Sequence, residues 1–115
     1  MTVPMHVTPI GSGALLAEPG DALNPATPAQ YLDRLAALIR QHGAHTFFYD
    51  MEHVPVIDPV YYDWLVAVHR MCVLLGAEFV PLHIRPAAAF ALTRLLTGPT
   101  PFRCVAEVEH LEKRA

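Results

Sequence analysis

The sequence has little positive charge and no long hydrophobic run. Lysine occurs once, at Lys113, and the 8 Lys and Arg residues are outnumbered by 11 Asp and Glu, for a formal net charge of −3. Nucleic-acid binders usually carry a basic stripe, so this balance argues against that class. The apolar runs are far shorter than a membrane span, and the pattern of a signal peptide is missing. We therefore expect a cytoplasmic protein with no membrane segment.

Motifs for catalysis and cofactor binding are also scarce. Ser12 is the only serine, and it lies in a glycine turn rather than in a GxSxG elbow. Neither a Walker-type loop nor a GxGxxG loop is present, which argues against nucleotide binding through a phosphate loop. Cys72 and Cys104 both lie among apolar residues and are interpreted as buried thiols. We expect no enzyme activity and no cofactor.

The chain is rich in apolar residues. Hydrophobic residues make up 53% of the sequence and charged residues 17%, so a folded domain is expected. A length of 115 residues suits one core, and no linker interrupts it, so residues 1–115 are expected to form a single domain. Most of the 11 prolines fall between apolar runs, where they mark the boundaries of elements.

The apolar runs alternate between strand and helix patterns. Two short strands are expected around the Gly11–Gly13 turn, and Pro9 indicates that the first is an edge strand or very short. The remaining elements are expected to alternate strictly, as helix 23–43, strand 45–51, helix 58–76, strand 77–84, helix 85–98, strand 101–106 and helix 107–115. Helices of this length between strands imply right-handed crossovers. The sequence thus predicts an α/β fold with a mixed sheet of about five strands flanked by helices.

The helix faces and ends have local signals. In the first helix, one face repeats apolar residues, namely Tyr31, Leu32, Leu35, Leu38 and Ile39. Thr27–Gln30 resembles a capping box with Pro28 at the first helical position, and Gly43 ends the helix. For the second helix, Gly76 is the expected C-cap.

The segment "VIDPVYYDW" predicts the start of the second helix. Asp58 suits the N-cap, because its carboxylate can accept backbone N–H groups of the first turn. Pro59 then falls at the first helical position, where its missing N–H costs nothing. Tyr62 is placed to pack back on Ile57, and Tyr61 is placed to project outward as a contact group. Half-buried packing is the alternative for both tyrosines.

Acidic and histidine side chains gather near two strand ends. Asp50, Glu52, His53 and Asp58 belong to one loop, and His83 follows the next strand. Parallel strands end at the same edge of a sheet, where ligands commonly bind. The spacing matches no recognised zinc or calcium pattern, so we expect no metal site.

The order of these motifs resembles a known family. "FFYDMEHVPVIDP" before a helix, followed by "LLGAEFVPLHIRPAAAFAL", resembles the STAS domain of anti-sigma factor antagonists, and especially the bacterial stressosome scaffold proteins. A response-regulator receiver also has an aspartate ending its third strand. That alternative requires a lysine after a later strand, and Lys113 is too far along the chain.

The resemblance implies a non-enzymatic switch or scaffold that docks on a serine kinase of the GHKL type or on STAS paralogues, with homo-oligomers also possible. In that family a Ser or Thr at the start of the helix is phosphorylated, and the matching position here is Pro59. A second family site, a threonine, falls near Leu82, and the usual glycine before the "IRP" turn is His83. The resemblance therefore implies that phosphorylation at these positions is absent.

Two function classes remain open from the sequence. The first is a protein-docking module, whose expected contact residues surround the strand ends and helix starts: Asp50, His53, Asp58, Pro59, Tyr61, Tyr62, His83 and Arg85. The second is a module that binds a small anionic or lipid-like ligand near the helix starts at Asp58 and Arg85, where an anion would be favoured. A docking module should expose apolar side chains at the Pro59 helix, and a ligand module should enclose a pocket there.

Overall fold

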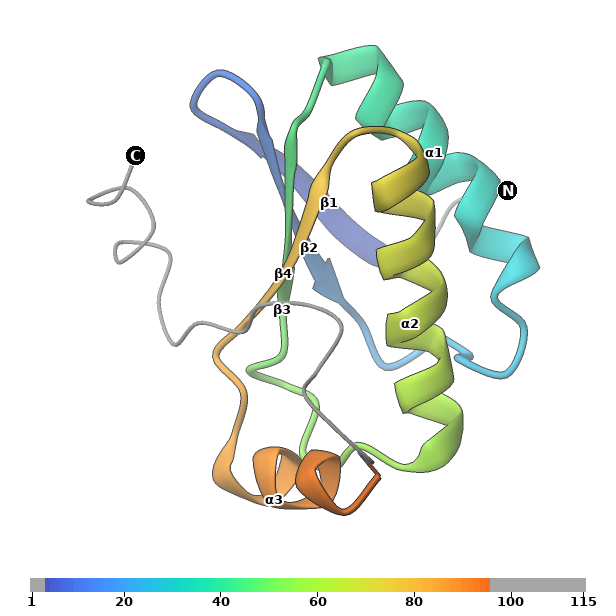
Figure 1. Ribbon diagram of the computed structural model, residues 1–115, viewed down its shortest axis with the longest axis vertical. Coiled ribbons are helices and arrows are strands. Elements are labelled where there is room, and N and C mark those ends of the chain that lie inside the picture. Colours follow the sequence, from blue (N-terminus) through green and yellow to red (C-terminus); the bar gives the residue numbers. More distant parts are fainter. Residues whose placement is uncertain (1–3, 96–115) are drawn as a thin grey trace.

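The computed structural model describes residues 4–95, which form four strands and three helices (Figure 1). In chain order they are β1 (Met5–Ile10), β2 (Ala14–Pro19), α1 (Ala29–His42), β3 (Thr46–Asp50), α2 (Pro59–Leu74), β4 (Glu78–Leu82) and α3 (Pro86–Leu95). This order confirms the first seven predicted elements and the α/β class. The predicted strand 101–106 and helix 107–115 lie outside the described residues.

The sheet is mixed, with the strand order β1-β2-β3-β4. β1 pairs antiparallel with β2, whereas β2, β3 and β4 run parallel to one another. β1 is an edge strand, as Pro9 predicts, because a proline cannot donate to a second neighbour. Gly11 and Gly13 both have positive φ angles, 58° and 117°, and make the turn between β1 and β2.

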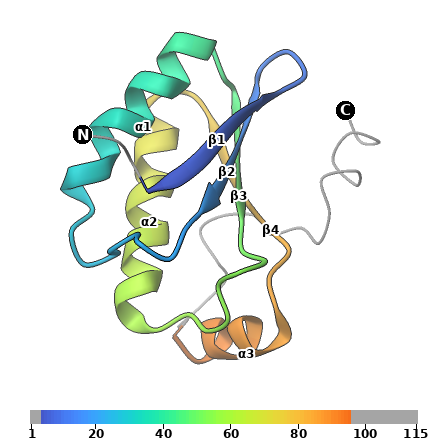
Figure 2. The same ribbon diagram turned by 180° about the vertical axis from the view of Figure 1, so that it is seen from behind.

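Helices α1 and α2 lie side by side on one face of the sheet (Figures 1 and 2). Their buried faces pack on the alternate strand residues that point toward them, including Leu15, Phe47 and Phe79. Phe48 and Val80 belong to a separate, smaller buried cluster. Helix α3 lies beyond the ends of β3 and β4 instead of on the sheet face. It thus borders the same edge as the loop before α2.

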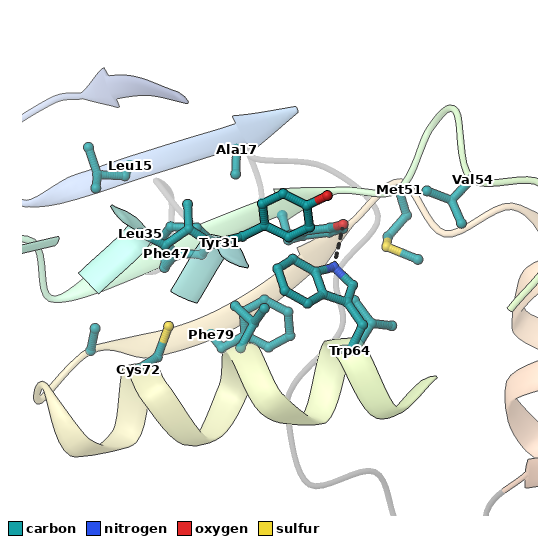
Figure 3. Close-up of a cluster of buried hydrophobic side chains, with 14 of the residues drawn as sticks. Leu15, Ala17, Tyr31, Leu35, Phe47, Met51, Val54, Trp64, Cys72 and Phe79 are labelled. Carbon is teal, nitrogen blue, oxygen red and sulfur yellow. Dashed lines mark hydrogen bonds between the residues drawn. The ribbon is translucent and has the colours of Figure 1, made fainter. Parts of the chain in front are cut away.

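Trp64 of α2 is the largest fully buried side chain. Its indole meets the ring of Tyr31 edge-on, with 5.8 Å between the ring centroids (Figure 3). Phe79 packs in turn against Tyr49 at 5.9 Å. These aromatic rings join both helices to the central strands, and the predicted apolar face of α1 is confirmed.

The predicted capping box of α1 is wrong. Pro28 is itself the N-cap, and no side chain caps the helix. The reason lies in the preceding turn: the Asn24 side chain accepts the N–H of Ala26 at 3.0 Å, and the Thr27 hydroxyl donates to the Asn24 carbonyl at 3.2 Å. The Thr27 hydroxyl thus points into this turn, and no backbone N–H of the helix bonds to it. Gly43 ends α1 in the left-handed conformation, as predicted.

The end of α2 differs from prediction by one residue. Leu75 is the C-cap, and Gly76 follows it with a φ of 76°. The N–H of Ala77 donates to the carbonyl of Cys72 at 2.8 Å, which gives the Schellman arrangement. Gly76 therefore supplies the left-handed residue of that motif. None of the helices within residues 4–95 is long and apolar enough to span a membrane.

Candidate functional site

The candidate site is the edge of the sheet where β3 and β4 end. The loop of residues 51–58 leaves β3 at this edge and leads into α2, while residues 83–85 connect β4 to α3 (Figure 1). We call the loop 51–58, the first turn of α2 and residues 83–85 the carboxyl edge. The fold therefore brings the predicted loop and helix starts to one end of the molecule, as the parallel pairing of β3 with β4 requires.

Asp50 and His83 are in contact at this edge. The Nδ1 atom of His83 lies 3.0 Å from Oδ1 of Asp50, and the same oxygen accepts the backbone N–H of Glu52 at 2.9 Å. Ligand atoms of Asp50, Glu52 and His83 all lie within 4.8 Å of one another, close enough to hold a cation. In this structure the Asp50 carboxylate ties the loop after β3 to the residue after β4.

His83 adopts a backbone conformation that favours glycine. Its φ is 55°, and it is the only non-glycine residue with a positive φ among the described residues. A left-handed conformation costs a residue with a Cβ about 1–2 kcal/mol. The contact with Asp50 offsets part of this cost, since a hydrogen bond contributes about 0.5–1.5 kcal/mol net.

We expect the backbone at His83 to control which substitution is tolerated. His83→Gly and His83→Ala both remove the contact with Asp50, so the difference between them isolates the backbone. The glycine variant should have the larger free energy of unfolding, by about 1 kcal/mol, in urea titrations. The matched control is the exposed helical residue Asp33, where alanine should instead be the more stable by about 1 kcal/mol. If the alanine variant at His83 were as stable as the glycine variant, the proposed backbone strain at this position would be contradicted.

Asp58 caps α2 as predicted. Its Oδ1 atom accepts the backbone N–H of Tyr61 at 2.7 Å, and Pro59 occupies the first helical position. Both Asp58 and Pro59 are exposed. The helix start is therefore stabilised locally and leaves its first residue open to solvent.

Tyr61 does not project outward, and the alternative of half-buried packing holds for it. It is half-buried, and its hydroxyl lies 2.6 Å from the hydroxyl of Tyr49 on β3. The Tyr49 hydroxyl also accepts the indole N–H of Trp64 at 2.9 Å, drawn as the dashed line in Figure 3. A side chain at the third helical position faces the sheet here because the buried Tyr49 hydroxyl gives it a polar partner.

Burial disfavours ionisation of these hydroxyls. Desolvation raises the pKa of Tyr61 to about 12, partly opposed by the hydrogen bond with Tyr49, and desolvation also raises the pKa of Tyr49 well above its usual value. Burial likewise raises the pKa of the Cys72 thiol to about 12. Cys72 is therefore a protonated core residue at neutral pH, as predicted.

The remaining predicted residues are spread over different surfaces. His53 is exposed and lines a cleft between the loop 51–58 and the segment after β2. Tyr62 lines a second cleft along the outer side of α2. Arg85 is exposed and forms no ion pair with residues 4–95. Neither of these two clefts has Asp58 or Arg85 in its lining, which gives the small-ligand alternative no support.

Apolar side chains are exposed around Pro59. Val56, just before the cap, is 55% exposed, and Val60, just after Pro59, is 46% exposed. On α3, Phe90 is 64% exposed. The sequence reasoning did not single out these residues, although two valines flanking an "IDP" cap were a visible signal. The carboxyl edge thus combines acidic groups with an exposed apolar surface.

The arrangement of elements and the carboxyl edge define the STAS fold, and the comparison with solved structures agrees. A serine-to-glutamate variant of RsbS from Moorella thermoacetica superposes with a TM-score of 0.79 and 20% identity, over 97% of this chain and 95% of that one. A chain from the structure of the stressosome, described as a signal integration and transduction hub, gives a TM-score of 0.78 and 20% identity, with 94% of each chain covered.

A third solved structure, the NMR structure of the protein TM1081, gives a TM-score of 0.72 and 14% identity over 98% of this chain and 87% of that one. No family model and no curated protein sequence matches the chain. The chain therefore has the STAS fold found in RsbS and stressosome proteins, at a sequence identity that shows the fold alone.

Proposed function

We propose that the protein is a regulatory docking module of the anti-sigma factor antagonist or stressosome-scaffold type. It acts by protein–protein contact through the carboxyl edge. The observation that carries the proposal is the exposed apolar surface around Pro59, where Val56 and Val60 are each about half exposed. Apolar side chains gathered beside polar groups are typical of protein interfaces.

The proposed partners are a serine kinase of the GHKL type or other STAS-domain proteins, including copies of this chain. The likeness to a stressosome chain over nearly the full length supports assembly with such domains. Pro59 has no hydroxyl to phosphorylate and stands at the exposed helix start. The docking state is therefore set by the sequence at this position and not by a phosphate.

The test is affinity capture of the tagged protein from its native cells, with the bound proteins identified by mass spectrometry. Recovery of a GHKL-type kinase or a STAS-domain protein supports the proposal. Capture should fall about tenfold or more with Val60→Asp, since burying a charge in an apolar contact costs more than about 1.4 kcal/mol. The variant should stay folded, because an aspartate in the first turn suits the helix dipole.

Val73→Asp is the matched control for this experiment. Val73 is also on α2 and is 59% exposed, but it lies near the other end of the helix. Capture should be unchanged in this variant. Equal loss in both variants, or a capture that never contains a kinase or a STAS-domain protein, would overturn the proposal.

A further inference from the structure

Burial favours one direction for the hydrogen bonds that join Trp64, Tyr49 and Tyr61. An indole N–H can donate but not accept, so the Tyr49 oxygen accepts from Trp64 at 2.9 Å. Either hydroxyl of the Tyr49–Tyr61 pair, 2.6 Å apart, could be the donor, but donation by Tyr49 is favoured because it leaves no unpaired hydrogen on this fully buried residue. The hydrogen of Tyr61 then has no acceptor among residues 4–95.

Tyr61 lines a small cleft at the carboxyl edge. The cleft has a volume of about 220 Å³ and lies between the segment after β2 and the loop 51–58. Pockets for drug-sized ligands measure roughly 300–1,000 Å³, so this one suits a group the size of a side chain. Val56 lines the cleft and is also part of the exposed apolar surface, which makes the two continuous.

The walls of the cleft offer few other hydrogen-bond donors. Three of the lining residues are prolines, which have no backbone N–H: Pro19, Pro25 and Pro55. The backbone N–H groups of Gly20, Leu23 and Val54 are already bonded to carbonyls, at 3.0, 3.2 and 3.0 Å. Tyr61 thus brings a hydroxyl to a cleft in which many of the other groups are apolar or already bonded, apart from the side chains of Asp21 and His53.

The charges beside the cleft favour a neutral acceptor. Asp21 belongs to the lining, and the Asp58 carboxylate is held at the N–H of Tyr61. His53 is the only basic side chain in the lining. Two carboxylates disfavour an anion, whereas the carbonyl of an amide carries no charge and accepts a hydrogen bond well.

We propose that this cleft takes a small apolar side chain from an extended segment of a partner protein, with the Tyr61 hydroxyl donating to a backbone carbonyl of that segment. The inference rests on the proposed docking function and adds the chemistry of the partner. A partner segment would supply both the apolar side chain and the backbone carbonyl. The exposed Val56 and Val60 beside the cleft would contact the flanking residues of that segment.

The test uses N-acetyl-valinamide as the probe, because it presents one small apolar side chain between two neutral carbonyls. Binding is followed in ¹H–¹⁵N NMR spectra of the wild-type protein. The chain has a single tryptophan, so one indole N–H signal reports directly on the hydrogen bonds that end at Tyr61. We expect a saturable shift of this signal and of the backbone N–H signals of the non-proline residues within 53–61. N-acetylvaline, which carries a carboxylate, should bind more weakly than the amide.

Tyr61→Phe should weaken binding of the amide probe about two- to tenfold, the range of one neutral hydrogen bond, while Tyr62→Phe should leave it unchanged. No shift in wild-type protein, or tighter binding of the carboxylate probe, overturns the inference, even if the phenylalanine variant fails to fold. Probe binding is independent of the capture experiment. Capture of a kinase or STAS-domain protein without probe binding would overturn only the inference about the cleft. Probe binding without such capture would overturn only the proposed regulatory role.

Discussion

Replacing Trp64 with alanine is expected to lower the free energy of unfolding by about 3–5 kcal/mol. The indole is fully buried between both helices and the sheet, so the substitution leaves a cavity and deprives the Tyr49 hydroxyl of its donor. Such a loss is a large share of the roughly 5–15 kcal/mol that stabilises a typical domain. Urea unfolding followed by far-ultraviolet circular dichroism measures it, because the variant has no tryptophan left to fluoresce.

Leu74→Ala is the control for the Trp64 substitution. Leu74 is on the same helix and is 86% exposed, so its truncation should change stability by no more than about 0.5 kcal/mol. A Trp64→Ala protein that unfolds at nearly the same urea concentration as the wild type would contradict the core described above.

Tyr49→Phe should cost about 1–3 kcal/mol although it removes a single oxygen atom. That oxygen is the only acceptor for the indole N–H of Trp64 among residues 4–95, and it lies 2.6 Å from the Tyr61 hydroxyl. Its removal leaves a fully buried donor without a partner, and the surrounding core gives water no easy access. Urea titration of the variant, with the tryptophan fluorescence as signal, gives the loss directly.

Tyr62→Phe makes the same chemical change at a half-buried position on the outer side of α2. Its hydroxyl has no hydrogen bond to a residue within 4–95, so its loss should be close to neutral. If the variants at Tyr49 and Tyr62 were equally stable, the chain of hydrogen bonds from Trp64 to Tyr61 would not exist in solution.

Features determined by neighbouring residues could be predicted from the sequence. The Asp58 cap, Pro59 at the first helical position and the left-handed Gly43 all depend on contacts within one turn, and the structure has them as expected. The order of strands and helices through α3 was also predictable, because proline and glycine mark each boundary. The failed capping box at Thr27 shows the limit, since the Thr27 side chain turns toward the carbonyl of Asn24, three residues away, and not toward the helix.

Features that depend on distant pairing could not be predicted. The inward turn of Tyr61 follows from the buried hydroxyl of Tyr49, twelve residues away along the chain. The contact of Asp50 with His83 spans thirty-three residues, and sequence reasoning could place both at one edge but not in contact. The cleft that Tyr61 lines is formed by two loops whose approach depends on the whole sheet. Local sequence patterns contain no signal for such long-range contacts.

Pro59 has a consequence for how this protein can change over generations. Codons for proline differ from those for serine and threonine by a single base at the first position. The Asp58 cap holds the helix start through its own side chain, and Pro59 is exposed, so a small hydroxyl residue there would require no other change in the fold. A protein with a hydroxyl at this exposed helix start is therefore a single base change away from the present one.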